Sequence, residues 1–183
     1  LFDRLKRDEP RFRYRAVQFN PLGETGLIRD LVELTLALIQ PADRLAWLAV
    51  LRAPFCGLEL ADLEALAAAG PVIPDAVEQF LAGELDGPGK DGRARLRRVG
   101  PLLATASRRN GRGPLRALVE STWLRLGGPA CLENRSGHAD AASYFDLLEA
   151  MESEGSAIDR ESLFQRLENL SSEPDSDAGE GLQ

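Results

Sequence analysis

The residue types that most often carry catalysis are scarce in this sequence. The chain of 183 residues has one histidine, His138, and two cysteines, Cys56 and Cys131. His138 lies in a polar stretch, where a surface or capping role is the simplest expectation. The cysteines are too far apart to indicate a disulfide framework or a zinc site, so we expect free buried thiols, as in a reducing cytoplasm. A histidine-rich metal centre is excluded.

The sequence also lacks a nucleotide-binding motif. The chain has no Gly-x-x-x-x-Gly-Lys-Ser/Thr phosphate loop, which excludes an autonomous P-loop ATPase. The stretch from Gly83 to Gly92 holds four glycines, but its proline and acidic residues are typical of a linker. We therefore expect neither a cofactor nor a metal in this chain.

Arginine is the residue whose number and spacing indicate a binding function. Ten basic and two acidic residues lie between Lys90 and Arg125, whereas three basic and thirteen acidic residues lie between Glu133 and Gln183, within an overall charge of −7. Such basic clusters commonly bind phosphate groups. The candidates are Arg93, Arg97, Arg98, Arg108, Arg109, Arg112 and Arg116. Alternatively, the same arginines form a solvated helix face that pairs with the acidic C-terminal helices, and charge alone favours this second interpretation.

Apolar residues at three- and four-residue spacing predict helices from Thr25 onward. The first helix covers about 25–40, with Thr25 as its N-cap. Pro41 suits the first turn of the second helix, which ends at Arg52. That second helix carries apolar residues on every side, so we expect it to be central and buried; these residues are Leu45, Trp47, Leu48, Val50 and Leu51.

Six further helices are expected, at 60–69, 74–81, 92–107, 114–126, 140–153 and from 156 onward. Pro101 lies inside the fifth helix of the chain and predicts a kink or a break there. Ser156 to Asp159 resembles a capping box at the start of the eighth helix. The sequence thus predicts a mostly helical, all-α fold.

One short strand is expected before the helices, over 11–19, where aromatic and basic residues alternate. No second strand of similar quality follows, so we expect its partners to lie outside this chain, which would then be part of a longer protein. The predicted division is 1–24 as the edge of an adjoining domain, 25–170 as a helical domain and 171–183 as an acidic disordered tail. No apolar run reaches the roughly 18 residues that span a membrane.

The stretch from Phe12 to Leu63 resembles UvrD/Rep-type superfamily 1 DNA helicases, especially RecB/AddA-like members. The resemblance covers the point where the second RecA-like domain gives way to the helical 2B insertion. It rests on a Glu-x-x-x-Ile-Arg-Asp core, on the start of the next helix and on an Arg-x-Pro-x-x-Gly turn. The matching residues are Glu24, Ile28, Arg29, Asp30, Asp43, Ala46, Arg52, Pro54 and Gly57. The stretches Leu-Gly-Gly-Pro-Ala-Cys and Tyr-Phe-Asp-Leu-Leu-Glu also resemble later parts of that insertion.

The resemblance implies a non-catalytic helical subdomain of an ATP-dependent helicase that acts in DNA unwinding, repair or recombination in the cytoplasm. ATP and Mg²⁺ would then bind elsewhere in the longer protein. DNA, the RecA-like domains and a nuclease are the implied partners. Arg52 and Gly57 would contact DNA or a neighbouring domain, although only one glycine remains here of the family's common Gly-Ile-Gly turn, in Cys56-Gly57-Leu58. The alternative is a helical protein-interaction module that binds no nucleic acid.

Overall fold

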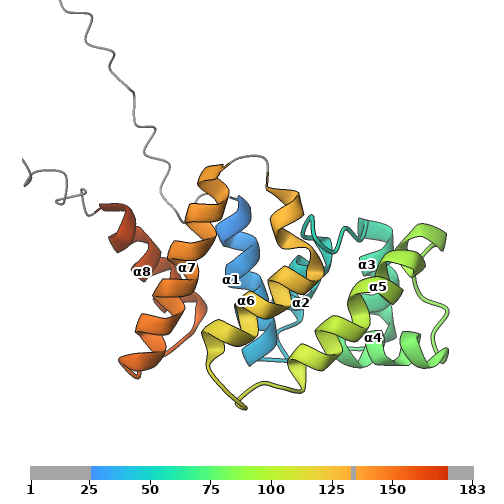
Figure 1. The fold of residues 1–183 in the computed structure, drawn as a ribbon. Helices are drawn as coiled ribbons and strands as arrows, with labels where there is room; N and C mark the ends of the chain where they lie inside the picture. Colours follow the sequence, from blue (N-terminus) through green and yellow to red (C-terminus); the bar gives the residue numbers. More distant parts are fainter. Residues whose placement is uncertain (1–25, 133–134, 173–183) are drawn as a thin grey trace, which may run out of the picture.

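A computed structural model describes residues 26–132 and 135–172 of the chain (Figure 1). All regular structure in these residues is helical, which confirms the all-α prediction. The elements are α1 (Gly26–Ile39), α2 (Arg44–Arg52), α3 (Leu60–Ala69), α4 (Ile73–Ala82), α5 (Lys90–Ser107), α6 (Leu115–Leu126), a 3₁₀ turn η2 (Gly128–Cys131), α7 (Arg135–Ser153) and α8 (Arg160–Ser172). The predicted strand over 11–19, the N-cap at Thr25 and the tail beyond 172 lie outside the described residues.

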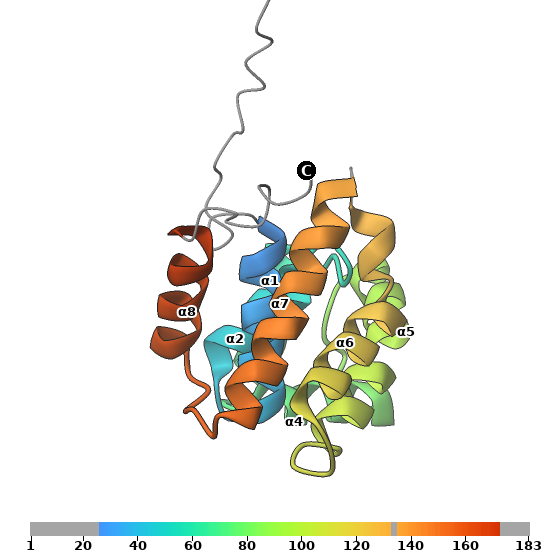
Figure 2. The same cartoon turned by 60° about the vertical axis from the view of Figure 1, so that its left-hand side comes forward.

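Helix α1 is the centre of the fold. It contacts α2, α5, α6, α7 and α8, and its leucines Leu31, Leu34 and Leu38 are fully buried. Figures 1 and 2 show α1 enclosed between α7 and α6 on one side and α2 on another, with α8 at the outer edge. Buried side chains on nearly all faces of α1 join these helices into one hydrophobic core.

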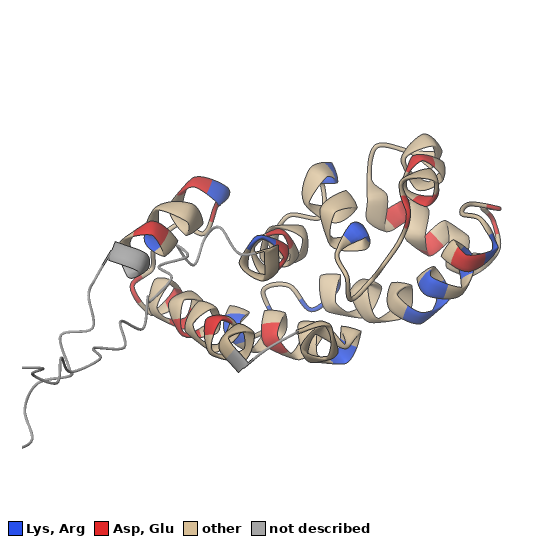
Figure 3. Ribbon diagram, turned by 90° about the horizontal axis from the view of Figure 1, so that it is seen from above, with Lys and Arg blue, Asp and Glu red and all other residues tan. Residues whose placement is uncertain are grey.

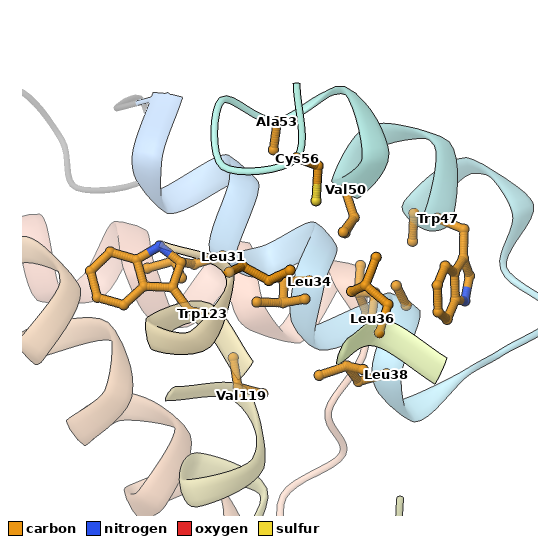
Figure 4. Packing of buried hydrophobic residues seen from close by; sticks show 14 of the residues in the cluster. Leu31, Leu34, Leu36, Leu38, Trp47, Val50, Ala53, Cys56, Val119 and Trp123 are labelled. Carbon is orange, nitrogen blue, oxygen red and sulfur yellow. The ribbon is translucent and has the colours of Figure 1, made fainter. Parts of the chain in front are cut away.

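Helix α2 is buried on one face only, so the prediction that it is central and buried on every side was wrong. Its inner face, with Trp47 and Val50, is buried against α1, whereas Leu45 is 75% exposed and Leu48 is only partly buried. Figure 4 shows Val50 and Cys56 directed toward leucines of α1. Apolar residues on every side of a helix therefore do not mean that every side is covered by this domain.

Three helix boundaries differ from the sequence-based predictions. Asp43 is the N-cap of α2, since its Oδ1 accepts from the backbone N–H of Ala46 at 3.0 Å, and Pro41 therefore lies before the helix rather than in its first turn. Asp159 caps α8 in the same way, accepting from the N–H of Ser162 at 2.8 Å. Helix α7 begins before the predicted position 140 and therefore includes His138, which is exposed.

The sequence predicted a kink or a break at Pro101; helix α5 runs continuously from Lys90 to Ser107, so there is no break at this position. The two cysteines also differ from each other. Cys56 is a buried free thiol, and burial raises its pKa to about 12, whereas Cys131 is exposed, contrary to prediction.

The buried hydroxyl groups of Thr35 and Tyr144 share a hydrogen bond of 2.7 Å that joins α1 to α7.

Candidate nucleic-acid interface

The turn between α2 and α3 has the conformation that its sequence predicts. Gly57 has a φ of +75°, a backbone angle that favours glycine. The N–H groups of Cys56 and Gly57 both donate to the carbonyl of Ala53, at 2.9 and 2.8 Å, and the N–H of Leu58 donates to Leu51 at 3.0 Å. These N–H groups are therefore hydrogen-bonded within the turn and are not available to bind a phosphate.

Arg98 holds this turn against the body of the domain. From α5, its guanidinium donates to the carbonyl oxygens of Phe55 at 2.9 Å and Cys56 at 3.4 Å. It also donates to the carbonyl of Leu126, at 3.3 Å, at the end of α6. Three backbone carbonyls from two separate segments thus use the donors of one arginine. We conclude that Arg98 is a positioning residue for the turn.

Carboxylates occupy the N-terminus of α3, where the helix dipole would otherwise attract a phosphate. Asp62, which is 6% exposed, accepts from the N–H of Glu59 and from the N–H of Gly89, both at 3.1 Å. Glu59 in turn pairs with Arg95 at 3.2 Å. A Cβ on Gly92 would lie only 2.2 Å from an Asp62 oxygen, so α5 approaches α3 closely here. This end of α3 is built for helix packing.

Three further candidate arginines, two on α5 and one just after it, also contact other parts of the protein. Arg93 donates through Nε to the carbonyl of Pro88 at 2.8 Å. The guanidinium carbon of Arg97 lies 5.9 Å from the centre of the Phe80 ring, a cation–π distance. Arg108, just after α5, pairs with a glutamate of α4, Glu78, at 2.7 Å. Exposed pairs of this kind contribute little to stability but partly neutralise the basic stretch.

Arg116 makes the pairing with the acidic C-terminal helices that the charge pattern indicates. Its Nη1 contacts Asp146 at 2.7 Å and also binds Glu149, both on α7. Its Nε lies 3.5 Å from Glu120 on the same helix. The hydrogen bond to Glu149 is the main reason that the pKa of Arg116 is raised above its ordinary value. The second interpretation of the charge pattern therefore holds for this residue.

Arg109 and Arg112 differ from the other candidate arginines of the stretch. They lie on the loop between α5 and α6, are exposed, and form no ion pair with any described residue. Together with Gly113, Pro114, Ala117 and Leu118 they line a shallow hollow of about 130 Å³. Figure 3 shows the basic and acidic positions spread over the helices. This loop carries two cations available to an external anion.

Two contacts fix the position of this loop, which we call the α5–α6 loop (residues 108–114). Asn110 Nδ2 donates to the carbonyl of Ile39 at the end of α1, at 3.1 Å. Both carboxylate oxygens of Glu152, on α7, accept from the N–H of Leu115 at 3.0 Å. Because a carboxylate already caps α6, an incoming phosphate would have to bind through the arginine side chains rather than through the helix N-terminus.

The sequence could not distinguish these roles. Arg98, Asp62 and Glu152 act on groups 27 or more positions away, and no local pattern shows such contacts. One signal was available, since Glu59-x-x-Asp62 has the spacing of a capping box. Arg52 is exposed at the end of α2, and the structure brings it to an apolar hollow rather than to the α5–α6 loop.

Other kinds of site are not found in the described ranges. No group of three or more His, Cys, Asp or Glu side chains there could hold a metal ion. None of the helices described is long and apolar enough to cross a membrane. Comparison of the chain with protein-family models, with curated proteins and with solved structures gave no match.

Proposed function

We propose that this chain is a non-catalytic helical subdomain, of the 2B type, from a UvrD/Rep-type ATP-dependent DNA helicase, and that it contacts duplex DNA through the α5–α6 loop. The observation that carries the DNA contact is the presence of two exposed arginines, Arg109 and Arg112, without a carboxylate partner in the described structure. The helicase assignment rests on the resemblance of residues 12–63. The Arg52-x-Pro-x-x-Gly57 turn between two helices is consistent with it.

The role of the chain in such a helicase would be binding and orientation. ATP and Mg²⁺ would be held by the RecA-like domains of the longer protein, which acts on DNA in the cytoplasm, with or without a nuclease partner. Arg109 and Arg112 would each neutralise a phosphate of the duplex backbone, without reading its sequence. Asn110 would keep the loop in place against α1.

Titration of the purified chain with labelled duplex DNA, together with an ATPase assay, tests this proposal. We expect no ATP hydrolysis and weak binding, with a dissociation constant of about 10⁻⁴ to 10⁻⁶ M, typical of non-specific contacts. Affinity should be the same for unrelated sequences and should fall as salt is raised. DNA-stimulated ATP turnover by clean protein would refute the subdomain assignment, and absence of binding at low salt would refute the DNA contact.

A helical protein-interaction module is the second candidate, and the internal contacts of the arginines favour it. Arg95, Arg98, Arg108 and Arg116 all bind carboxylates or carbonyls of the same domain. If these contacts account for the whole basic stretch, the chain will not bind duplex DNA at any salt concentration. Replacing the arginines would then reduce stability only.

A further inference from the structure

An apolar hollow lies between α2 and α3, on the side of α2 that faces away from α1. Its volume is about 260 Å³, and it is lined by Leu48, Ala49, Arg52, Leu60, Leu63, Glu64 and Ala67. Leu60, at its edge, is 61% exposed, and Leu45, one turn before Leu48, is 75% exposed. Two of the four exposed large hydrophobic residues in the described structure therefore lie at or next to this hollow.

The hollow has the shape that receives a helix. On α2, positions 45, 48, 49 and 52 follow the three- and four-residue spacing of one helix face, and on α3 positions 60, 63, 64 and 67 do the same. Two such faces side by side form a groove into which the ridge of a third helix packs. Amphipathic helices bind grooves of this kind through aliphatic residues spaced one turn apart.

The charges at the hollow define what such a helix must carry. Arg52 and Glu64 are both exposed lining residues, and neither has an ion pair within the described part of the chain. Arg52 is at the last turn of α2, whereas Glu64 is in the second turn of α3. A docked helix would therefore place an acidic residue beside Arg52 and a basic residue beside Glu64.

We propose that the hollow between α2 and α3 is a docking site for an amphipathic helix of a partner protein, with leucine-like side chains in the hollow, an acidic residue at Arg52 and a basic residue at Glu64. The site does not depend on the DNA contact, because it uses other residues on other helices. It explains why α2 is apolar on a face that the domain leaves open.

A synthetic helical peptide tests this site on the full chain. The peptide carries leucines at i, i+3 and i+7, with a glutamate placed to meet Arg52 and a lysine placed to meet Glu64; a second peptide has these two charges exchanged. We expect the first peptide to bind, and Leu60→Ser to weaken its binding at least about fivefold. The matched control is Leu124→Ser, at a leucine of α6 that is 50% exposed, which should leave binding unchanged.

Exchanging the charges at the hollow tests the proposed docking most sharply. Arg52→Glu should weaken the first peptide by about threefold to tenfold, and the double variant Arg52→Glu with Glu64→Arg should restore binding of the exchanged peptide. Circular dichroism establishes that each variant remains folded. Equal binding of both peptides to the wild-type chain, no binding at millimolar peptide, or equal effects of Leu60→Ser and Leu124→Ser would overturn the proposal. Self-association that Leu60→Ser abolishes would also overturn it, because a second copy would then occupy the hollow.

Discussion

The guanidinium of Arg98 lies 2.9 Å from the carbonyl oxygen of Phe55, a residue 43 positions earlier in the chain. This contact joins α5 to the turn after α2. It shows that an arginine of the basic stretch can serve the fold rather than bind a ligand. Arg98 belongs to the same run as Arg93 and Arg97, yet its donors are used by backbone carbonyls. Its role is to position the turn, and a ligand would have to displace these hydrogen bonds to use it.

Replacing Arg98 should therefore reduce stability. We expect Arg98→Ala to lower the free energy of unfolding by about 1–2 kcal/mol, because hydrogen bonds from a charged donor contribute roughly 1.5–3 kcal/mol and this side chain is partly solvated. Urea denaturation measures the change. Arg125→Ala, at an exposed arginine of α6, is the control and should cost less than about 0.5 kcal/mol. Equal costs for the two variants would contradict the positioning role.

Two of the three leucines of α2, Leu48 and Leu51, should respond differently to truncation. Leu51 is fully buried, so Leu51→Ala should cost about 2–5 kcal/mol, the usual range for a buried leucine. Leu48 is only partly buried beside the open hollow, and Leu48→Ala should cost about 1 kcal/mol. Thermal or urea melts of both variants measure this. A loss at Leu48 as large as that at Leu51 would show that α2 is covered on both faces.

Asp30 should make stability depend on pH. Burial, with a smaller contribution from Glu33, raises the pKa of Asp30 to about 6, above the value of 3.8 expected in the unfolded chain. The folded state thus holds this proton more tightly, so stability decreases as pH rises from about 4 to about 6 and the penalty remains above that range. Asp30→Asn should remove the penalty and stabilise the chain by about 1 kcal/mol at pH 7.5, after allowance for solvent screening.

Urea denaturation at pH 4 and pH 7.5 measures this effect. At pH 4 the wild-type chain and Asp30→Asn should differ little, because the Asp30 carboxyl is then largely protonated in the folded state. Asp86→Asn, at an exposed loop position, provides the control for removing one negative charge. A stabilisation by Asp30→Asn that is the same at both pH values would exclude titration of Asp30 as its cause.

Local signals predicted many of the helices but not how each is covered. The predicted range of α3, 60–69, matches Leu60–Ala69, since a turn precedes it and Gly70 follows. The start of α7 was missed because its first turn, Arg135-Ser-Gly-His, has no apolar residue to show a period. The open face of α2 was missed because apolar periodicity reports hydrophobicity, whereas burial depends on which helices pack there.

Local sequence signals were equally unable to show which arginines of the candidate site are paired. In the sequence, Arg108 and Arg109 are adjacent and equivalent. In the structure, Arg108 pairs with Glu78 of α4, whereas Arg109 faces the hollow of the α5–α6 loop. The partner of each arginine is decided by helices that are distant along the chain. Composition could therefore identify the basic stretch but could not show which of its cations remain available.

The central claim is that Arg109 and Arg112 contact duplex DNA, and a comparison of two double variants tests it most directly. Fluorescence anisotropy measures binding of a labelled duplex at two or more salt concentrations. The variant Arg109→Ala with Arg112→Ala should weaken binding and reduce the salt slope by about 1.8, since each lost phosphate contact removes roughly 0.9. The variant Arg95→Ala with Arg108→Ala removes the same charge from paired arginines and should change the slope much less. Equal losses from both variants, or a duplex that the wild-type chain does not bind at low salt, would contradict the assignment.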